Sequence, residues 1–512
     1  MAAGTRLLFL TLAALALLTL PRVLKVGMFF DGVTFSSFAR NLAEGKGTFW
    51  APHYTETVWP RYFDVPPLGF WLQSWVYRLF GDHVSLDPMW DLATGLLIVL
   101  LLVPMWTLAW RTEQAAVGAW WPVLMFVSFP MTAKTLTHNL MEHPMAVFVL
   151  ASSVLALLGL SRREVRAQIG YGTASGLLLV AACLTKGPQA IFPLVLPVFA
   201  ALFFPSAVRW RHALVSTVSM AGALVGGIAI IYVSSPGARE FFHAFTQGVL
   251  SQLQGGRGGG QASRWAFFGA GLLQLAVPVG IGALGALLCK TPVRIFKNRR
   301  FGFFLALACC GSLPLLISPK LYARYLFPSL PFFALALGAL FESVALRVEQ
   351  LVQDRRTWSR AVMGAAIGGG VVAVALMLVN AGEVRRAKEF HADLPLQGVD
   401  LDGRALVSVC PSALTADWRL VANMQRVYRA SLTGRLGGRF LLVEKQGHCS
   451  IPPHCELLQA TPPLKYLLYR CQPESGPAVE NQRPHGEITL AEERSERYAR
   501  VGPTTLFRLT PS

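Results

Sequence analysis

The segment LLFLTLAALALLTLPRVLKVGMFFDGVTFSSFARNLAEG, residues 7–45, joins two kinds of sequence. Its first half is an apolar run whose two charged residues, Arg22 and Lys25, lie at its end, and a helix of about 20 predominantly apolar residues crosses the hydrocarbon core of a bilayer. Its second half spaces Phe35, Phe38 and Leu42 along one helical face that stops at Gly45, which is typical of a helix lying in the membrane interface. Asp31 stands between the two halves.

Apolar runs recur along the chain. Of its 512 residues 53% are hydrophobic and 14% are charged, whereas soluble proteins have roughly 25% charged residues. The chain is therefore predicted to be a polytopic α-helical membrane protein with about eleven transmembrane helices. The candidate spans lie near 7–26, 90–110, 115–131, 141–160, 170–185, 189–205, 213–233, 265–288, 301–317, 325–345 and 361–381.

The formal charge of +18 follows the predicted topology. Fifteen Lys and Arg residues occupy one alternating set of short loops, whereas the opposite short loops hold four, so nucleic acid is not an expected partner. The positive-inside rule then places the N-terminus in the cytoplasm and both the 27–89 loop and the 382–512 segment outside. Because no A-x-A cleavage site precedes Asp31, the first span is predicted to be a retained anchor.

The chain is predicted to divide into a transmembrane domain, 1–381, and a small outer domain of mixed α/β structure, 382–512. In the outer domain, ALVSVC, RFLLVEKQ, KYLLYRC and TTLFRLT are typical of strands, and DWRLVANMQRVYRASL is typical of a helix. The outer domain also holds Cys410, Cys449, Cys455 and Cys471. An even number of cysteines in an oxidising compartment favours one or two disulfides of unspecified pairing, although zinc held by HCSIPPHC, residues 448–455, is an alternative.

Four cations lie in the short outer loops, against the rule that places the others. They are Lys134, Lys186, Lys320 and Arg324. For each one, simple snorkelling to water is an alternative. The joint occurrence of Lys186, Lys320 and Arg324 beside Gly, Pro and Tyr favours an anion site at the outer membrane surface. Arg257 lies in the glycine-rich 234–264 loop and can reach the same anion if this loop is a mobile lid. The simpler interpretation is that the loop is a flexible linker.

The 27–89 loop is long and rich in aromatic residues. After Pro66 and Pro67 it contains LGFWLQSWVYRLFG, which predicts a second amphipathic helix whose aromatic residues suit the headgroup region. Asp31 is the acid of this loop nearest the membrane surface, where partial desolvation makes a carboxylate a candidate general base. The alternative is a helix N-cap, which the sequence DGVTF allows.

The order of these features resembles the GT-C-type membrane glycosyltransferases that use polyprenyl-phosphate sugars. This group contains the protein O-mannosyltransferases and the aminoarabinose transferase of lipid A. The resemblance rests on an Asp after the first span, a PPLGFW element, a TKGP helix end and a late YARYLFPSLPFFAL span, and it covers roughly residues 7–345. In two places the chain departs from the family pattern. Gly32 replaces a second acid, and Val65 replaces a lysine before the two prolines.

The resemblance implies that Asp31 is the catalytic base and that Asp64 helps to hold a divalent metal. It also aligns His143, in MEHPM, with a family aspartate and places Glu142 beside it. His53 and His138 are further candidates for metal binding or acid–base chemistry, although interfacial histidines without a ligand are the simpler interpretation. Lys186, Lys320, Arg324 and Arg257 are the candidates for donor-phosphate binding.

The implied activity is inverting transfer of a sugar from a polyprenyl-phosphate donor to a hydroxyl of a lipid, glycan or protein at the outer face of the bacterial inner membrane. The C-terminal domain is then periplasmic, and membrane lipids are partners. The alternative is a transporter or flippase of lipid-linked sugars without transfer chemistry. Transporters usually show internal repeats and charges deep inside their spans, and the sequence shows no such repeat, so the enzyme is favoured.

Overall fold

The computed structural model describes residues 2–109, 118–162, 164–254, 263–293, 298–318, 321–394, 406–447, 449–458 and 463–472. The chain forms two compact units, each assembled from three separate segments. Unit 1 comprises Met1–Val26, Val65–Phe242 and Ala262–Glu383. Unit 2 comprises Gly27–Asp64, His243–Gln261 and Val384–Ser512, so the C-terminal segment shares its unit with two earlier parts of the chain.

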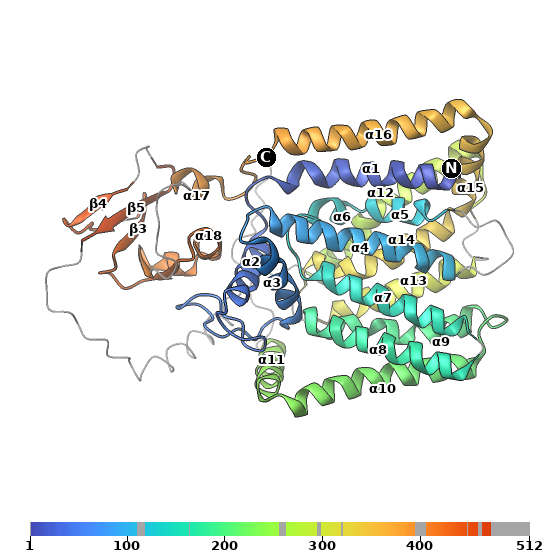
Figure 1. Cartoon of the computed structure of the whole chain (residues 1–512), viewed down its shortest axis with the longest axis horizontal. Helices are drawn as coiled ribbons and strands as arrows, with labels where there is room; N and C mark the ends of the chain where they lie inside the picture. Colours follow the sequence, from blue (N-terminus) through green and yellow to red (C-terminus); the bar gives the residue numbers. More distant parts are fainter. Residues whose placement is uncertain are drawn as a thin grey trace. The chain divides into compact units, whose positions relative to one another are not determined.

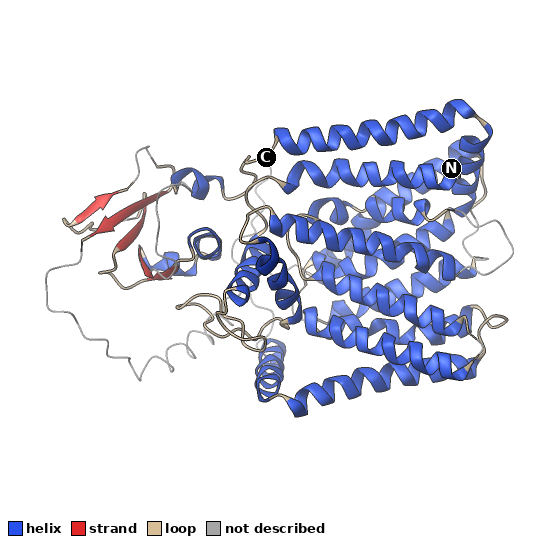
Figure 2. Cartoon of the chain, viewed as in Figure 1, coloured by secondary structure: helices blue, strands red, loops and turns tan. Residues whose placement is uncertain are grey.

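Unit 1 is a bundle of apolar helices that run side by side (Figures 1 and 2). Among the described residues, nine helical segments are long and apolar enough to cross a membrane, and each coincides with a predicted span. They are α1 (Ala3–Val23), α4 (Leu86–Leu108), α7 (Glu142–Leu160), α8 (Val165–Lys186), α10 (Trp210–Ser234), α12 (Arg264–Cys289), α13 (Arg299–Ser312) with η2 (Leu313–Ile317), η3 (Ala323–Ser329) with α14 (Leu330–Leu340), and α16 (Arg356–Val379).

The other two predicted spans contain shorter elements, so the predicted count of about eleven is not confirmed. Residues 115–131 include α5 (Trp120–Val127) and the start of α6 (Pro130–Thr135), and residues 189–205 include η1 (Pro188–Val195) and α9 (Leu196–Phe203). Proline explains both interruptions, since it lacks the N–H that continues a helix. Pro130 begins α6, and Pro193 lies within the 3₁₀ segment η1.

Helices α8 and α10 pack through small residues. A Cβ added at Gly176 of α8 would lie 2.3 Å from the carbonyl oxygen of Met220, and one added at Gly172 would lie 3.0 Å from that of Ser216. Glycines four residues apart let two backbones approach closely, which is a common way to join helices in lipid.

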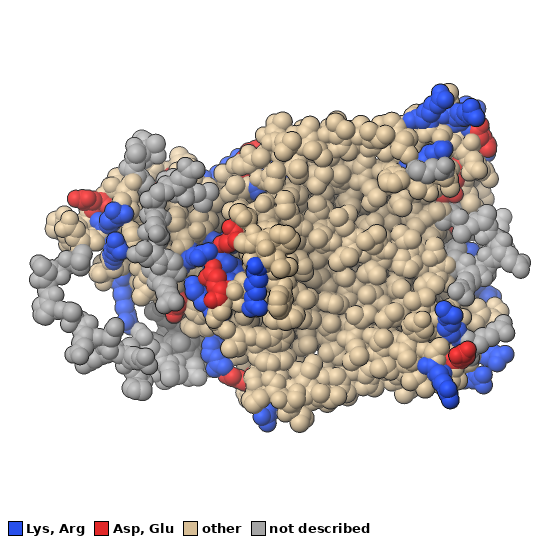
Figure 3. Space-filling model, in the orientation of Figure 1, with Lys and Arg blue, Asp and Glu red and all other residues tan. Residues whose placement is uncertain are grey.

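The surface of unit 1 is suited to lipid. Large apolar side chains point outward along α10, including Val218, Val225 and Ile230, each more than 60% exposed. On the face shown in Figure 3, the charged residues of unit 1 gather toward its two ends and leave a broad uncharged belt between them. Such a belt would be unfavourable in water and is favourable in a bilayer.

Both predicted helices of the first outer loop are present, as α2 (Phe30–Ala43) and α3 (Leu68–Phe80). Helix α3 ends at Gly81, whose φ of +78° favours glycine, and it exposes Trp75, Leu79 and Phe80 as expected of an interfacial helix. Helix α2 differs from the prediction, because its polar side chains are buried together with the apolar ones from Gly32 to Leu42. The 234–264 segment also differs from a simple loop, since Pro236–Gln254 forms helix α11.

The C-terminal part of unit 2 is a mixed α/β fold, as predicted. Its sheet has the order β2-β1-β3-β5-β4, in which β1 is parallel to β2 and β3, and β5 is antiparallel to β3 and β4. The elements are α17 (Lys388–Asp393), β1 (Leu406–Cys410), η4 (Ser412–Ala416), α18 (Trp418–Tyr428), β2 (Ser431–Thr433), β3 (Phe440–Glu444), β4 (Cys455–Leu457) and β5 (Tyr466–Cys471). The predicted strand TTLFRLT lies outside the described residues.

All four cysteines of this fold are paired. Disulfides join Cys410 to Cys449 and Cys455 to Cys471. Among the described residues, the one group of three possible metal ligands consists of His454 with Cys455 and Cys471, and its two sulfurs are bonded to each other. The predicted disulfides are therefore formed, and the alternative of a zinc site on these cysteines is not supported. Unit 1 also contains helix α15 (Glu342–Asp354), which follows α14 in the sequence.

Candidate active site

Asp31 lies in the first turn of α2 and is half-buried. It is not the N-cap, because Phe29 occupies that position without a side-chain hydrogen bond. The unpaired N–H groups and the dipole at a helix N-terminus stabilise a negative charge nearby. The first turn of α2 is therefore a favourable place for an acidic side chain.

In unit 1, a buried carboxylate lies between two of the predicted cations. Glu142 is the first residue of α7 and is fully buried. Its Oε1 lies 3.4 Å from Lys186 Nζ and 3.6 Å from Arg324 Nε. Neither carboxylate oxygen accepts a hydrogen bond from a described residue, so these two cations supply its electrostatic stabilisation. Lys186 and Arg324 thus lie beside one buried carboxylate, and their binding of a donor phosphate stays a prediction.

Local sequence explains how these cations reach one place. Lys186 is the last residue of α8, where a positive charge complements the helix dipole, and Gly187 turns the chain with a φ of +121°. Arg324 lies in the 3₁₀ segment η3. Its guanidinium is 4.4 Å from the ring centre of Tyr322, and both cations lie 5.6 Å from that of Tyr325. The two tyrosines add cation–π attraction that holds the cations at the ends of their helices.

A second buried pair consists of Asp91 of α4 and His143 of α7, which follows Glu142 in the sequence. The carboxylate of Asp91 contacts Nδ1 of His143, and its other oxygen accepts the backbone N–H groups of His138 and Asn139 at 2.8 and 2.9 Å. His143 Nε2 lies 3.0 Å from the hydroxyl of Thr135. Asp91 therefore fixes the loop that leads into α7, next to Glu142.

Asp91 was not among the residues singled out from sequence. It stands in PMWDLATG, at the start of an apolar span, and an acid inside a span is by itself a signal of a buried polar partner. Asp87 is a similar case. It is fully buried and accepts hydrogen bonds from Tyr77 and, at 3.0 Å, from Gln73 Nε2. This second acid fastens α3 to α4.

The remaining predicted residues are dispersed. His138 and His143 are buried in unit 1, whereas Asp64 is exposed and His53 is partly buried in unit 2. His53 pairs locally, with its Nε2 at 3.6 Å from Glu56 Oε1. Lys320 and Arg257 lie outside the described residues.

The donor chemistry in unit 1 does not favour a divalent metal. Both ring nitrogens of His143 are engaged by Asp91 and Thr135, and the carboxylate of Glu142 is already neutralised by two cations. A metal there would have to displace those partners. The expectation of a metal remains a prediction, and we assign it no chemical step.

Comparison with known proteins relates the sequence and the fold of the chain to named sugar transferases. No protein-family model matches the chain. The chain is 24% identical over 407 residues to the undecaprenyl phosphate-alpha-4-amino-4-deoxy-L-arabinose arabinosyl transferase 1 of Pseudomonas fluorescens, an alignment that covers 72% of this chain and 67% of that protein. It is also 24% identical to the corresponding transferase 2 of Proteus mirabilis, over 31% of this chain and 28% of that protein.

The fold comparison extends over nearly the whole chain. ArnT from Cupriavidus metallidurans, in a crystal structure with undecaprenyl phosphate, superimposes with a TM-score of 0.57 at 16% identity and covers 92% of this chain and 98% of that one. The archaeal oligosaccharyltransferase AglB from Archaeoglobus fulgidus, in complex with an inhibitory peptide and a dolichol-phosphate, has a TM-score of 0.51 at 12% identity over 86% and 69% of the two chains. The predicted resemblance is confirmed, and the chain is a multi-pass membrane protein with the fold of the GT-C-type membrane glycosyltransferases.

Proposed function

We propose that the chain is an inverting glycosyltransferase that moves a sugar from a polyprenyl phosphate to an acceptor hydroxyl at the outer face of the bacterial inner membrane. The observation that carries this proposal is the cluster of Lys186 and Arg324 around Glu142, in a chain whose fold matches that of ArnT bound to undecaprenyl phosphate. Two cations at the ends of membrane helices suit a phosphate whose lipid tail lies in the bilayer.

Asp31 supplies the base in this mechanism. An acceptor hydroxyl is a weak nucleophile, and Asp31 takes its proton as the hydroxyl oxygen attacks the anomeric carbon from the face opposite the phosphate. A new glycosidic bond forms while the bond from the anomeric carbon to the phosphate oxygen breaks, so the configuration at that carbon inverts.

The leaving group departs as polyprenyl phosphate with an additional negative charge. Lys186 and Arg324 stabilise that charge, and Tyr322 and Tyr325 keep the cations oriented before the donor arrives. Since Val65 replaces the lysine that the lipid A branch has at that position, these two cations are the principal phosphate ligands of this chain. Lys320 and Arg257 remain candidates for the same role.

The proposed orientation rests on the positive-inside rule, by which the cation-rich loops are cytoplasmic. The N-terminus is then inside and the C-terminal α/β fold periplasmic, and the two disulfides of this fold support an oxidising compartment. A lipid-linked donor and a periplasmic acceptor meet only at that face, which accounts for an acid immediately after the first span.

A flippase of lipid-linked sugars would use the same cations. The similarities in sequence and in fold are with named transferases, and this favours chemistry over transport. A transporter also has no need for a base at Asp31. The two functions therefore differ in whether the bond between sugar and phosphate is broken.

The test measures release of free polyprenyl phosphate from a panel of lipid-linked sugars by the purified full-length protein with an envelope extract as acceptor. We expect Asp31→Asn to lower release at least roughly a hundredfold, in the range of losing a general base. Asp82→Asn, which alters an exposed acid of the same loop, is the matched control and should remain active. Equal release by wild type and Asp31→Asn would remove Asp31 from the mechanism, and no release from any donor would favour the flippase.

A further inference from the structure

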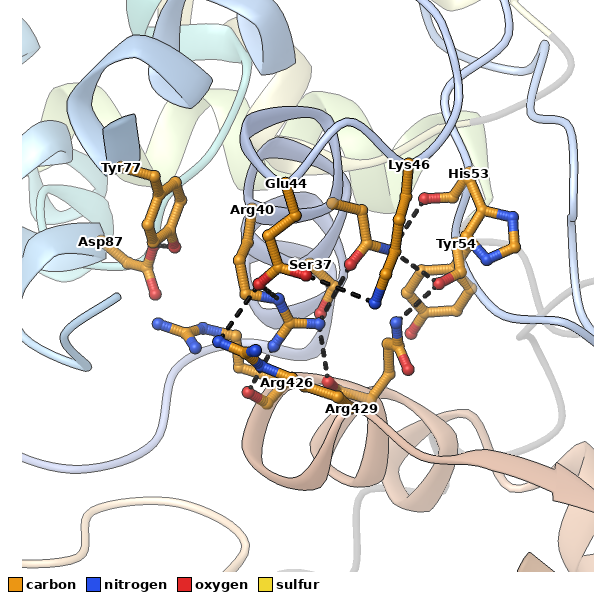
Figure 4. Close-up of polar contacts among 12 residues, drawn as sticks. Ser37, Arg40, Glu44, Lys46, His53, Tyr54, Tyr77, Asp87, Arg426 and Arg429 are labelled. Carbon is orange, nitrogen blue, oxygen red and sulfur yellow. Dashed lines mark hydrogen bonds and ion pairs between the residues drawn. The ribbon is translucent and has the colours of Figure 1, made fainter. Parts of the chain in front are cut away.

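Helix α2 bears the proposed base near its N-terminus and an arginine without access to water near its C-terminus. Arg40 is 1% exposed. Its Nη1 donates to the carbonyl oxygen of Arg426 at 2.9 Å, and its Nη2 donates to that of Gln425 at 3.0 Å (Figure 4). Both acceptors belong to the last turn of α18, so one buried guanidinium joins α2 to the C-terminal α/β fold.

This contact is favourable because of where it meets α18. The last carbonyls of a helix lack intrahelical partners and carry the negative end of the helix dipole, so a positive charge with several N–H donors suits that position. Arg429 ends the helix in the left-handed region, with a φ of +56°. The guanidinium thus caps α18 from a segment that is 386 residues away in sequence.

Two buried amides extend the connection. Asn41 Nδ2 donates to the carbonyl oxygens of His53 and Tyr54 at 2.9 and 2.8 Å, and Gln425 Nε2 donates to that of Tyr54 at 2.7 Å. The carbonyl of Tyr54 therefore receives one bond from α2 and one from α18. Asn41 and Gln425 are both nearly fully buried, and such a network has a single geometry when its bonds are made.

Further contacts hold both ends of α18. Glu44, just after α2, lies 3.1 Å from Arg429 Nη2 and 3.7 Å from Arg40 Nε. At the other end, Trp59 stacks on Trp418 with ring centres 4.7 Å apart. Helix α2 and the 53–59 loop together enclose α18, which explains why the polar face of α2 is buried instead of solvated.

We infer that Arg40 is a positioning residue that sets the place of Asp31 through α2, and that the C-terminal α/β fold is consequently part of the catalytic apparatus. Asp31 and Arg40 are nine residues apart in one uninterrupted helix, about 14 Å along its axis at 1.5 Å per residue. A shift at the Arg40 end therefore moves Asp31 as well. This inference rests on the proposed function, since it assigns Asp31 the role of base.

The experiment compares Arg40→Met, Arg40→Lys and the control Arg419→Met in the full-length protein. Arg40→Met keeps an apolar stem and loses every donor, whereas Arg419→Met alters an exposed arginine of α18 itself. Hydrogen exchange of 30–43 reports how firmly α2 is held, and initial rates of polyprenyl phosphate release give kcat and the KM for the donor.

We expect amides of 30–43 to exchange roughly tenfold to a hundredfold faster in Arg40→Met, because buried hydrogen bonds to a charged group are lost. We expect kcat to fall about a hundredfold, the effect of a displacement near 1 Å at a reacting group, with the donor KM changed less than about threefold. Arg40→Lys should recover part of kcat, and Arg419→Met should resemble wild type. If Arg40 had only a structural role, Arg40→Met would lower the yield of folded protein, and the folded fraction would not show a fall in kcat at an unchanged donor KM.

Unchanged exchange in Arg40→Met, or faster exchange with wild-type kcat, would overturn the inference while leaving the proposed function intact. No release by wild type would overturn both. If Arg40→Met does not fold, Gln425→Leu removes the donor to Tyr54 from the α18 side and is held to the same two criteria.

Discussion

Glu142→Gln is the most informative substitution in unit 1. The carboxylate of Glu142 is completely buried and lies 3.4 and 3.6 Å from the nitrogens of Lys186 and Arg324. Glutamine keeps the size of the side chain and removes its charge. The substitution therefore leaves two cations, which are 9% and 17% exposed, without the anion between them.

The expected magnitude follows from these distances. At an effective dielectric constant near 20, each pair contributes about 5 kcal/mol of Coulomb attraction. Desolvation of the three groups offsets much of that attraction, and removal of one member of a buried ion pair typically costs about 3–5 kcal/mol. We expect Glu142→Gln to lower the stability of unit 1 by this amount, which corresponds to a fall in Tm on the order of 5–10 °C.

Native cysteines provide the assay. Cys183, Cys289, Cys309 and Cys310 are free, partly buried and all in unit 1. A thiol-reactive fluorescent dye therefore reports unfolding of this unit during heating of the detergent-purified protein. Glu383→Gln is the matched control, because Glu383 pairs with Lys25 in the same unit but is 56% exposed. A surface pair contributes about 0–1 kcal/mol, so the control should lose little stability.

The rise in Tm on adding a phosphate ligand is a second test of the same cluster. Once residue 142 is neutral, Lys186 and Arg324 have lost the negative charge that they share, so they attract an added anion more strongly. Added undecaprenyl phosphate should therefore raise the Tm of Glu142→Gln more than that of wild type or Glu383→Gln. An unchanged Tm would show that the carboxylate does not hold the cations, and equal rescue in all three proteins would refute the assignment of these cations to the phosphate.

Three further predictions concern unit 2. Asp393 accepts backbone N–H groups of 464–466 at 2.6 to 2.7 Å, so Asp393→Asn should speed hydrogen exchange of these amides roughly tenfold to a hundredfold, and unchanged exchange would contradict the role. Burial lowers the pKa of His391. At a pH between the lowered pKa and about 6.5, the unfolded chain binds a proton that the folded chain does not bind. The free energy of unfolding of unit 2 should therefore fall as the pH drops below about 6.5. In urea titrations followed by Trp fluorescence, His391→Gln should abolish this dependence on pH. The disulfide from Cys455 to Cys471 closes a loop with a sequence separation of 16, so replacing both by serine should cost about 3 kcal/mol in the same titration, and an unchanged midpoint would show that the loop is held without it.

Features that depend on local periodicity could be predicted from the sequence. Nine spans, both helices of the first outer loop, strands β1, β3 and β5 and helix α18 all lie where hydropathy and residue spacing indicated. A segment must bury or solvate its own side chains wherever it lies, so its pattern carries that information without reference to the remainder of the chain. The cations of the outer loops could be found in the same way, because each one contradicts the charge pattern of its neighbours.

Pairings between distant residues required the tertiary structure. Asp91 meets His143 across 52 residues, and Arg40 meets Arg426 across 386. The sequence identifies each of these groups as polar, but a buried charge is stabilised by whichever partner the fold brings within hydrogen-bond distance. For the same reason the disulfide pairing and the burial of the polar face of α2 appear only in the folded chain, where long-range packing decides which groups lose contact with water.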